Sequence, residues 1–259
     1  MDDKLAILVL SCDKYSDLWD GFFYLLNKNF QVNNDKFLVS NKKKYQNEHV
    51  RDLNIIHTGE DSDWSSNLLL ALDQVPNRKI LIILEDIFVT TPIDLSLFKS
   101  IEKFVFAEDV QHFKILTSPK TKKASASEQI SKYQEGLTYL VTVNGIWDKD
   151  YLKSLLIKGE NAWQFEINGS YRAHFSSNKF FRSNTPLFGF KNMVEKGQWI
   201  KPNINWAVEN HIPINAHGRK IGNVILYFLK KYYFELIFSL PWRLRYSFSN
   251  FIKKALITY

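Results

Sequence analysis

The sequence is poor in cysteine and has no long apolar run. Its one cysteine among 259 residues, Cys12, has no partner for an internal disulfide, which excludes a disulfide-stapled protein and is typical of a reducing compartment. The first apolar run, 5–10, has six residues and lies between charged residues, so it predicts neither a signal peptide nor a membrane span. With 45% hydrophobic residues, 10 Gly and 7 Pro, the composition excludes collagen-like and disordered chains.

Motifs of several familiar enzyme classes are also absent. The sequence has no phosphate-binding P-loop, no GxGxxG and no GxSxG nucleophile elbow. These absences weigh against nucleoside triphosphatases, dehydrogenases and α/β-hydrolases. The six histidines show no HExxH or other metal-binding spacing, and we expect them to be structural.

The charge is distributed unevenly along the chain. Lys and Arg total 34 and Asp and Glu total 27, a net charge of +7. Residues 217–259 contain eight basic residues and one acidic residue, which leaves 26 of each in residues 1–216 by subtraction. A general nucleic-acid binder carries basic residues over its folded face, so we expect no nucleic-acid partner. We predict a neutral globular domain, 1–216, and a basic appendage, 217–259.

The appendage combines basic, aromatic and apolar residues. Eleven of its 43 residues are aromatic, and its longest apolar run, 224–229, has six residues. That run is far below the roughly 20 residues needed to span a bilayer. The pattern predicts amphipathic helices that lie on an anionic membrane surface, where basic side chains add to the gain from apolar burial. The alternative is a helical hairpin that packs on the globular part.

Apolar runs and helical periodicities alternate along the globular part. A β-α-β order of this kind predicts an α/β sheet, mostly parallel, with ligands beyond the carboxyl ends of the strands. A polar, Ser- and Lys-rich stretch, 120–132, predicts a surface loop. The expected strands are 5–10, 36–40, 54–57, 79–84, 112–117 and 137–143, and the expected helices are 16–27, 64–75, 94–106 and 148–157.

The strongest candidate for chemistry is the acidic pair Glu85-Asp86. It follows the strand signal KILIIL at once, where a buried strand opens into a loop. Two carboxylates in such a place are costly unless they are paired, hydrated or bound to a metal. Hard cations such as Mg²⁺ or Mn²⁺ take carboxylate and phosphate oxygens together, so the pair is a candidate metal–diphosphate site. The alternative is that Asp86 caps the next turn and Glu85 lies in water.

Two further groups of residues lie where strands are expected to end. Ser11, Asp13 and Tyr15 follow the first strand, and Asp13 has the chemistry to accept hydrogen bonds from a nucleobase or ribose with Tyr15 stacked nearby. The alternative for Asp13 is a helix N-cap. Asp63 and Trp64 open the second helix, where the N-terminus can help to hold an anion and where Asp63 is also a candidate N-cap.

Acidic and aromatic residues alternate in GENAWQFE, residues 159–166. Aromatic faces bind sugar rings, and a carboxylate beside them is a candidate general base for an acceptor hydroxyl. Trp163 is the candidate acceptor-binding residue, and Glu166 and Glu160 are the candidate bases. The alternative is that the aromatic residues here are core and that the acids cap or pair.

The order of these features resembles that of a known family. The sequence resembles bacterial GT-A-type glycosyltransferases of lipopolysaccharide O-antigen and capsule assembly in the segments ILVLSCDKYSDLW, DWSSNLLLALDQV, ILIILEDIFVT, YLVTVNGIWDKDYLKSLL, GENAWQFE and NMVEKGQWIKP. The resemblance covers residues 5–210. It implies a GT-A-like, Rossmann-type sheet flanked by helices, with a nucleotide-sugar donor over the N-terminal half.

The resemblance also implies roles for residues. Glu85 and Asp86 take the place of the family's DxD-like motif at the diphosphate and metal, Asp13 lies near the base of the nucleotide, and Trp163 lies on the acceptor side. An inverting enzyme keeps its catalytic carboxylate there, and Glu166 is preferred to Glu160. Ile87 and Phe88 follow Asp86, which departs from the DxD pattern and leaves the metal requirement open. A metal-free variant would need cations, and the candidates are Arg182, Lys191, Lys196 and Lys201.

The resulting expectation is a glycosyltransferase peripheral to the cytoplasmic face of the bacterial plasma membrane. It transfers a sugar to a hydroxyl of a lipid-linked surface glycan. Two other classes stay open: a non-catalytic membrane-associated scaffold in glycan assembly, and a metal-dependent phosphotransferase or nuclease. The second normally needs more acidic residues around its metals.

Overall fold

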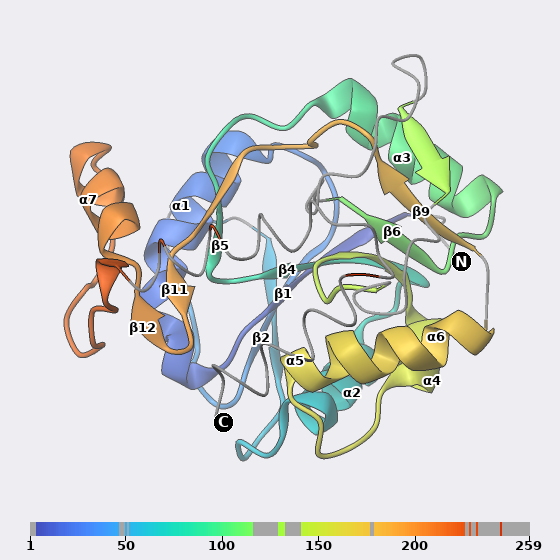
Figure 1. Ribbon diagram of the computed structural model, residues 1–259, viewed down its shortest axis with the longest axis horizontal. Coiled ribbons are helices and arrows are strands. Elements are labelled where there is room, and N and C mark those ends of the chain that lie inside the picture. Colours follow the sequence, from blue (N-terminus) through green and yellow to red (C-terminus); the bar gives the residue numbers. More distant parts are fainter. Residues whose placement is uncertain are drawn as a thin grey trace.

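Strands and helices alternate along the first half of the chain, as the apolar runs predict (Figure 1). The computed structural model describes residues 4–46, 50, 52–115, 129–132, 141–176, 179–225, 228, 232 and 244. Within these residues one eight-stranded sheet forms the centre of the molecule. In spatial order its strands are β3 (Leu53–His57), β2 (Lys36–Ser40), β1 (Ala6–Leu10), β4 (Lys79–Leu84), β8 (Gly145–Asp148), β6 (His112–Lys114), β9 (Phe180–Ser183) and β7 (Ile130–Lys132).

The sheet is mostly parallel. β3, β2, β1 and β4 pair in parallel, and β8 runs antiparallel to both β4 and β6. β9 is parallel to β6, and β7 is antiparallel to β9. Six strands therefore point the same way, and only β8 and β7 oppose them in the described sheet. The predicted Rossmann-type, mostly parallel α/β sheet is confirmed.

Helices cover both faces of the sheet, and each face has its own core (Figure 1). One core contains residues of α1 (Trp19–Asn29) and α3 (Leu95–Ala107). The other contains residues of α2 (Trp64–Gln74), α4 (Lys149–Leu155) and the continuous segment α5 (Ala162–Gln164), η2 (Phe165–Gly169) and α6 (Ser170–Ser176). Side chains of β1 alternate between them, with Ile7 and Val9 in the first and Leu8 in the second. Both faces of β1 are thus covered, which explains its continuous apolar run.

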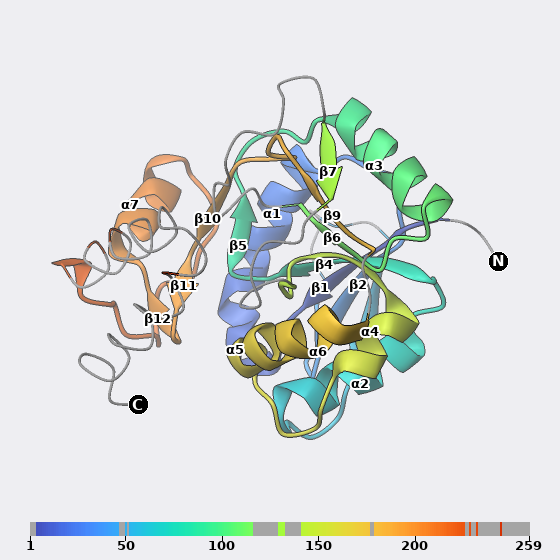
Figure 2. The same ribbon diagram turned by 45° about the vertical axis from the view of Figure 1, so that its right-hand side comes forward.

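A smaller layer packs beside α1 (Figure 2). β5 (Ile87–Val89), which follows the acidic pair, pairs antiparallel with β10 (Phe190–Asn192). A short hairpin of β11 (Val194–Glu195) and β12 (Gln198–Trp199) comes next, followed by α7 (Lys201–Glu209). The chain thereby returns from β10 to the end of β4, because Met193 donates its backbone N–H to the carbonyl of Asp86 at 2.8 Å.

Three local predictions differ from the structure. The first helix begins as a 3-10 helix, η1 (Asp13–Leu18), and continues as α1. Residues 130–132 of the predicted loop form the edge strand β7, and the rest of that loop lies outside the described residues. The strand predicted at 137–143 is wrong in its described part, 141–143, and the strand at this place is β8.

Residues 141–143 do not form a strand because side chains accept the hydrogen bonds of the backbone N–H groups of Val141 and Val143. The backbone N–H of Val141 donates to the Ser170 hydroxyl at 3.1 Å, and that of Val143 donates to Glu166 Oε1 at 3.0 Å. Thr142 donates its hydroxyl to the Asn144 carbonyl at 2.9 Å. These bonds to the helical segment replace the bonds that a strand ladder would need, and an apolar run alone does not reveal them.

Most of the predicted appendage, 217–259, lies outside the described residues, apart from 217–225, 228, 232 and 244. The prediction of membrane-surface helices and the boundary at 216/217 therefore remain predictions. No helix within the described part of the chain has the length and apolarity that crossing a membrane requires.

Candidate functional site

The candidate site lies at the edge of the sheet where the parallel strands end. The chain passes from β1 to β2 and β3 on one side and then to β4 on the other side of β1, so the strand order reverses between β1 and β4. Ligands of open α/β sheets bind outside the carboxyl ends of the strands at such a point. Ser11 follows β1 and Glu85 follows β4. The predicted donor-binding residues after the first strand and the acidic pair therefore both lie at this reversal.

The acidic pair is withdrawn from water. Glu85 is 6% exposed, and the Oδ1 atom of Asp86 is buried without a hydrogen-bond partner. Burial and the neighbouring charge of Asp86 raise the pKa of Glu85 well above its usual value. Burial also raises the pKa of Asp86 to about 6. Glu85 is therefore not a solvated surface residue, and Asp86 Oδ1 lacks the partner that a buried carboxylate oxygen normally needs.

Tyr15, predicted as a donor-binding residue, lies in η1 near this pair. The charges of Glu85 and Asp86 are among the causes that, after burial, raise the pKa of Tyr15. The guanidinium carbon of Arg219 lies 4.3 Å from the centre of its ring. Sequence analysis missed Arg219, because it is one basic residue among many in the appendage and no local motif distinguishes it.

Asp13 connects the loops that follow β1 and β2. Its carboxylate accepts backbone N–H bonds from Asn41, Lys42 and Lys43 at 3.0 to 3.2 Å. Its own backbone N–H donates to Asn41 Oδ1 at 3.1 Å. Asp13 is thus not an N-cap, and its contacts within the chain join two loops at the carboxyl edge. Ser11 lies beside it and accepts a hydrogen bond from Trp19 Nε1 at 2.8 Å.

Asp63 and Trp64 lie at the start of α2, and Trp64 contacts the segment GENAWQFE, residues 159–166. Asp63 caps α2, because its carboxylate accepts from the backbone N–H of Ser66 at 2.9 Å and from its hydroxyl at 2.6 Å. These bonds lower the pKa of Asp63 to about 2. The ring of Trp64 lies 5.5 Å from that of the buried Phe165. Sequence analysis left open whether Phe165 is core, and the structure places it there.

The two candidate bases lie in different surroundings. Glu160 accepts two hydrogen bonds from the Arg172 guanidinium, at 3.0 and 2.7 Å, and one from Asn168 at 2.9 Å. Burial alone would raise the pKa of Glu160, but these hydrogen bonds and the Arg172 charge lower it overall. Burial raises the pKa of Glu166, against the hydrogen bond from Val143 and the charge of Lys114. A general base works best with a pKa near the operating pH, so the direction of the two pKa shifts favours Glu166.

The helix that carries Glu166 is locally irregular. Residues 165–169 form a π turn, in which hydrogen bonds run from i to i+5. Such turns are rare and are frequent at functional sites.

A buried lysine, Lys114, lies close to Glu166. Lys114 and Arg182 are paired residues of β6 and β9, and they are 3% and 7% exposed. Burial and the charge of Arg182 lower the pKa of Lys114 to about 7, against the opposing charge of Glu166. Sequence analysis missed Lys114, although a lysine inside the apolar run HFKILT was the available signal.

The other predicted cations are distributed over the smaller layer. Lys191 Nζ lies 5.2 Å from the ring centre of Trp206. Lys196, at the tip of the β11–β12 hairpin, places its Nζ 6.0 Å from the ring centre of Trp163. Trp163 is 47% exposed, and this contact places the hairpin tip beside the predicted acceptor side.

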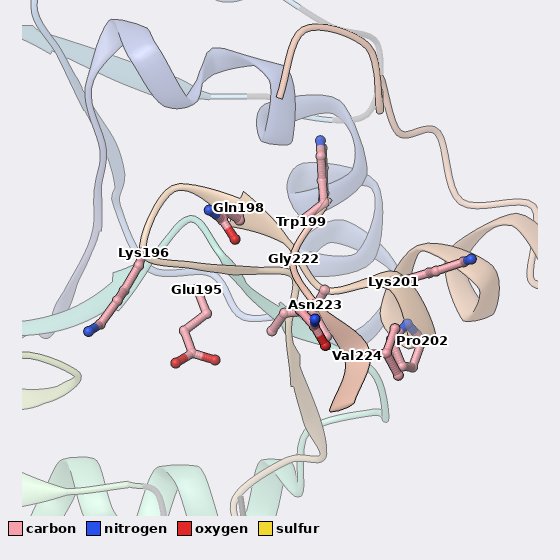
Figure 3. Close-up of a pocket in the computed structure, with 10 residues that line it drawn as sticks. Glu195, Lys196, Gln198, Trp199, Lys201, Pro202, Gly222, Asn223 and Val224 are labelled. Carbon is pink, nitrogen blue, oxygen red and sulfur yellow. The ribbon is translucent and has the colours of Figure 1, made fainter. Parts of the chain in front are cut away.

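Lys196 and Lys201 also line a cavity of about 250 Å³ between the hairpin, the start of α7 and residues 222–224 (Figure 3). Its other walls include Glu195, Pro202 and Asn223. The side chain of Trp199 points away from Pro202 and Asn223 (Figure 3). This cavity lies beside the hairpin rather than at the acidic pair.

The carboxylates of Glu85 and Asp86 have the chemistry that a Mg²⁺ or Mn²⁺ ion would need, since these cations take oxygen ligands. Mg²⁺ is commonly held by one or two carboxylates together with substrate phosphates, and the unpartnered Oδ1 of Asp86 is an available ligand atom. Within the residues that the structure describes, no group of three or more His, Cys, Asp or Glu side chains forms a self-contained metal site.

The sequence matches no protein-family model and no curated protein sequence. Among solved structures, the chain is similar to S. aureus TarS 1–349 in complex with UDP, with a TM-score of 0.50 and 12% identity over 71% of this chain and 59% of that one. The complex of TarS 1–349 with UDP-GlcNAc gives 0.48 and 12% over 76% and 60%, and TarS gives 0.48 and 12% over 75% and 37%. The chain thus spans between 37% and 60% of the length of these structures. At this identity the likeness concerns the fold alone, and it agrees with the predicted mostly parallel α/β sheet flanked by helices.

Proposed function

We propose that the protein is a glycosyltransferase that moves a sugar from a nucleotide-sugar donor to a hydroxyl of an acceptor glycan. The observation that carries this proposal is the buried acidic pair at the strand reversal, Glu85 and Asp86, in which Asp86 Oδ1 has no hydrogen-bond partner. A TarS structure of the same fold contains UDP, and another contains UDP-GlcNAc. A nucleoside diphosphate with its cation is the ligand class that would complete this pair.

On the donor side, Glu85 and Asp86 would hold a divalent cation, which would supply Lewis-acid stabilisation of the diphosphate leaving group. Tyr15 lies in η1 beside the pair, where its ring can contact the nucleotide. Asp63 holds the N-terminus of α2 in place, and Trp64 packs against Phe165, which fixes α2 against the helix of the candidate base.

On the acceptor side, Glu166 is the proposed general base. Its carboxylate takes the proton of the acceptor hydroxyl as that oxygen forms a bond to the anomeric carbon. The bond between the anomeric carbon and the diphosphate oxygen breaks, and its electron pair leaves with the diphosphate. Attack opposite the leaving group inverts the configuration. Trp163 offers an exposed aromatic face to the acceptor sugar, and the hydrogen bond from Val143 fixes the carboxylate of Glu166.

The acceptor we propose is a lipid-linked surface glycan of the O-antigen, core or capsule type. The support is the family resemblance and the basic, aromatic composition of residues 217–259, which suits attachment to an anionic membrane. The protein would then act at the cytoplasmic face of the plasma membrane as a peripheral enzyme.

A thermal-shift screen tests the donor. UDP, GDP, CMP and dTDP are each added with and without Mg²⁺, and we expect at least one to raise the melting temperature, since a ligand of the native state stabilises it. Asp86→Ala should weaken that response and abolish sugar transfer. A wild-type protein that responds to none of the nucleotides would instead support the non-catalytic scaffold, and full transfer by Asp86→Ala would remove the acidic pair from the mechanism.

A further inference from the structure

The helical segment that carries Glu166 is held from two sides. On one side, the carboxylate of Glu166 accepts the backbone N–H of Val143 at 3.0 Å, and the hydroxyl of Ser170 accepts that of Val141 at 3.1 Å. These bonds attach the π turn η2 and the first residue of α6 to the chain that leads into β8. On the other side lies Glu160, which precedes the segment in the sequence.

Glu160 connects this segment to a neighbouring helix. Its carboxylate accepts one hydrogen bond from Asn168 Nδ2 at 2.9 Å and two from the Arg172 guanidinium at 3.0 and 2.7 Å. Asn168 lies within the π turn and Arg172 lies four residues later in α6, so both are on one face of the segment. The carbonyl of Glu160 accepts the backbone N–H and the hydroxyl of Ser65 at 3.2 and 2.9 Å. Glu160 therefore joins the start of α2 to η2 and α6.

The pair of Glu160 and Arg172 is mostly withdrawn from water. Their side chains are 12% and 24% exposed. Among the described residues the guanidinium bonds only to Glu160, and its Nε atom is buried without a hydrogen-bond partner. A planar guanidinium that donates to both oxygens of one carboxylate is fixed in orientation as well as in position. Removing one member of such a pair leaves the other charge uncompensated, so the face that carries Asn168 and Arg172 should loosen.

We propose that Glu160 is a positioning residue that, through Asn168 and Arg172, holds the π turn so that the carboxylate of Glu166 stays on the N–H of Val143. The two acids that sequence analysis named as candidate bases then have different roles: Glu166 is the proposed base, and Glu160 orients it. This inference rests on the proposed function, since it concerns the base of the same site. The alternative is that Glu160 only stabilises the fold as a whole.

Amide hydrogen exchange measured by NMR follows the contact of Glu166 directly and needs no substrate. The exchange rate of the Val143 N–H is divided by that of the buried Ile7 N–H in β1, which donates to the carbonyl of Asp35 at 2.8 Å. Global unfolding exposes both amides, whereas local opening of the π turn exposes only the first. In Glu160→Gln this ratio should rise about tenfold or more, because hydrogen bonds to a charged group are lost beside the turn.

Variants of the two donors test whether Glu160 acts through them. Arg172→Met should raise the ratio about as much as Glu160→Gln does, and the double variant should add little, because both changes remove one interaction. Arg172→Lys should lie between Arg172→Met and wild type, since lysine keeps the charge and loses the fork. Asn168→Ala removes the single bond inside the π turn and should raise the ratio by a smaller factor.

Lys153→Met is the matched control. Lys153 and Asp73 form an ion pair that joins α4 to α2 in the same layer of helices, and their side chains are 35% and 59% exposed. Exposed pairs contribute little to stability, so Lys153→Met should leave the ratio within about twofold of wild type.

The outcomes separate this inference from the proposed function. If no nucleotide raises the melting temperature of the wild type, the proposed function fails whatever the exchange rates are. If Glu160→Gln leaves the ratio unchanged, or raises the Val143 and Ile7 rates in equal proportion, the positioning role is overturned and the proposed function is untouched. If Glu160→Gln does not fold, Arg172→Lys and Asn168→Ala decide the matter by the same ratio.

Discussion

Asp86→Asn should make the protein more stable at neutral pH while it removes activity. The native state raises the pKa of Asp86 from 3.8 to about 6 because the carboxyl is buried. At 1.36 kcal/mol per pH unit, this difference corresponds to a cost on the order of 3 kcal/mol for keeping the ionised carboxylate in the folded protein. Asparagine has nearly the same shape and no charge, so it avoids that cost. The variant should also ease the burial of Glu85, whose pKa the charge of Asp86 helps to raise.

The sign of the pH dependence follows from linkage. Because the folded pKa of Asp86 lies above the unfolded one, the native state binds more protons between pH 4 and 6, and this group lowers the stability as the pH rises through that range. The stability of Asp86→Asn minus that of wild type should therefore grow by about 2 to 3 kcal/mol between pH 4 and pH 7, without divalent cations. Guanidinium chloride unfolding at a series of pH values measures it.

A surface acid provides the control for this measurement. Asp35 is half exposed in a weak pair with Lys4 at 3.7 Å, so Asp35→Asn should change the stability by less than about 0.5 kcal/mol. If the difference in the free energy of unfolding between Asp86→Asn and wild type does not change with pH, Asp86 is not a buried, uncompensated charge. The series is repeated with Mg²⁺ and the nucleotide that binds. The stability of wild type should then rise and that of Asp86→Asn should not, because only the wild type keeps both carboxylates that would hold the cation.

Three other variants test the site. Glu166→Gln should bind the nucleotide with the wild-type dissociation constant. Its rate of transfer in single-turnover kinetics should fall by about two to four orders of magnitude, the usual range for a general base. A normal rate would show that another residue is the base. Trp163→Ala should raise KM for the acceptor and leave the donor constant unchanged in steady-state assays. Asp63→Ala should destabilise the protein by about 1 kcal/mol and Asp63→Asn by much less, because asparagine is also a good N-cap; equal losses in denaturant unfolding would contradict the capping role.

The sheet was predictable because burial on both faces leaves a direct trace in the sequence. The continuous apolar runs of β1 and β4 follow from helices that cover both faces, and the acidic pair after β4 is visible because it ends such a run abruptly. The false strand at 137–143 shows the limit of that signal. In its described part, Val141 and Val143 are fully or nearly fully buried, yet their backbone bonds go to the side chains of Ser170 and Glu166. An apolar run reports burial and does not report the hydrogen-bond partner.

The candidate site was predictable only where its residues follow strands. Asp86 lies just after the end of β4 and Tyr15 lies in η1, the turn of helix after β1, and the topology brings both to one edge. Arg219 and Lys114 escape this reasoning for different reasons. Arg219 is 202 residues from its partner Asp17, and nothing local connects them. Lys114 lies inside a strand, and only the pairing of β6 with β9 shows that it shares its burial with Arg182.

The position of Arg219 changes how the appendage must be tested. Composition places the boundary at 216/217, and a shortened protein that ends there would lose Arg219 and the bonds of residues 220–222 to Trp199 together with the lipid-binding residues. Its failure in an activity assay would then combine the loss of these contacts with the globular part and the loss of the basic, aromatic sequence. A chain that ends after Ile225 keeps every described contact of the segment and removes the rest of the basic, aromatic sequence. Flotation with anionic liposomes should separate this shorter chain from the full one, while both bind nucleoside diphosphate equally, and equal flotation would place the lipid-binding surface within the globular part.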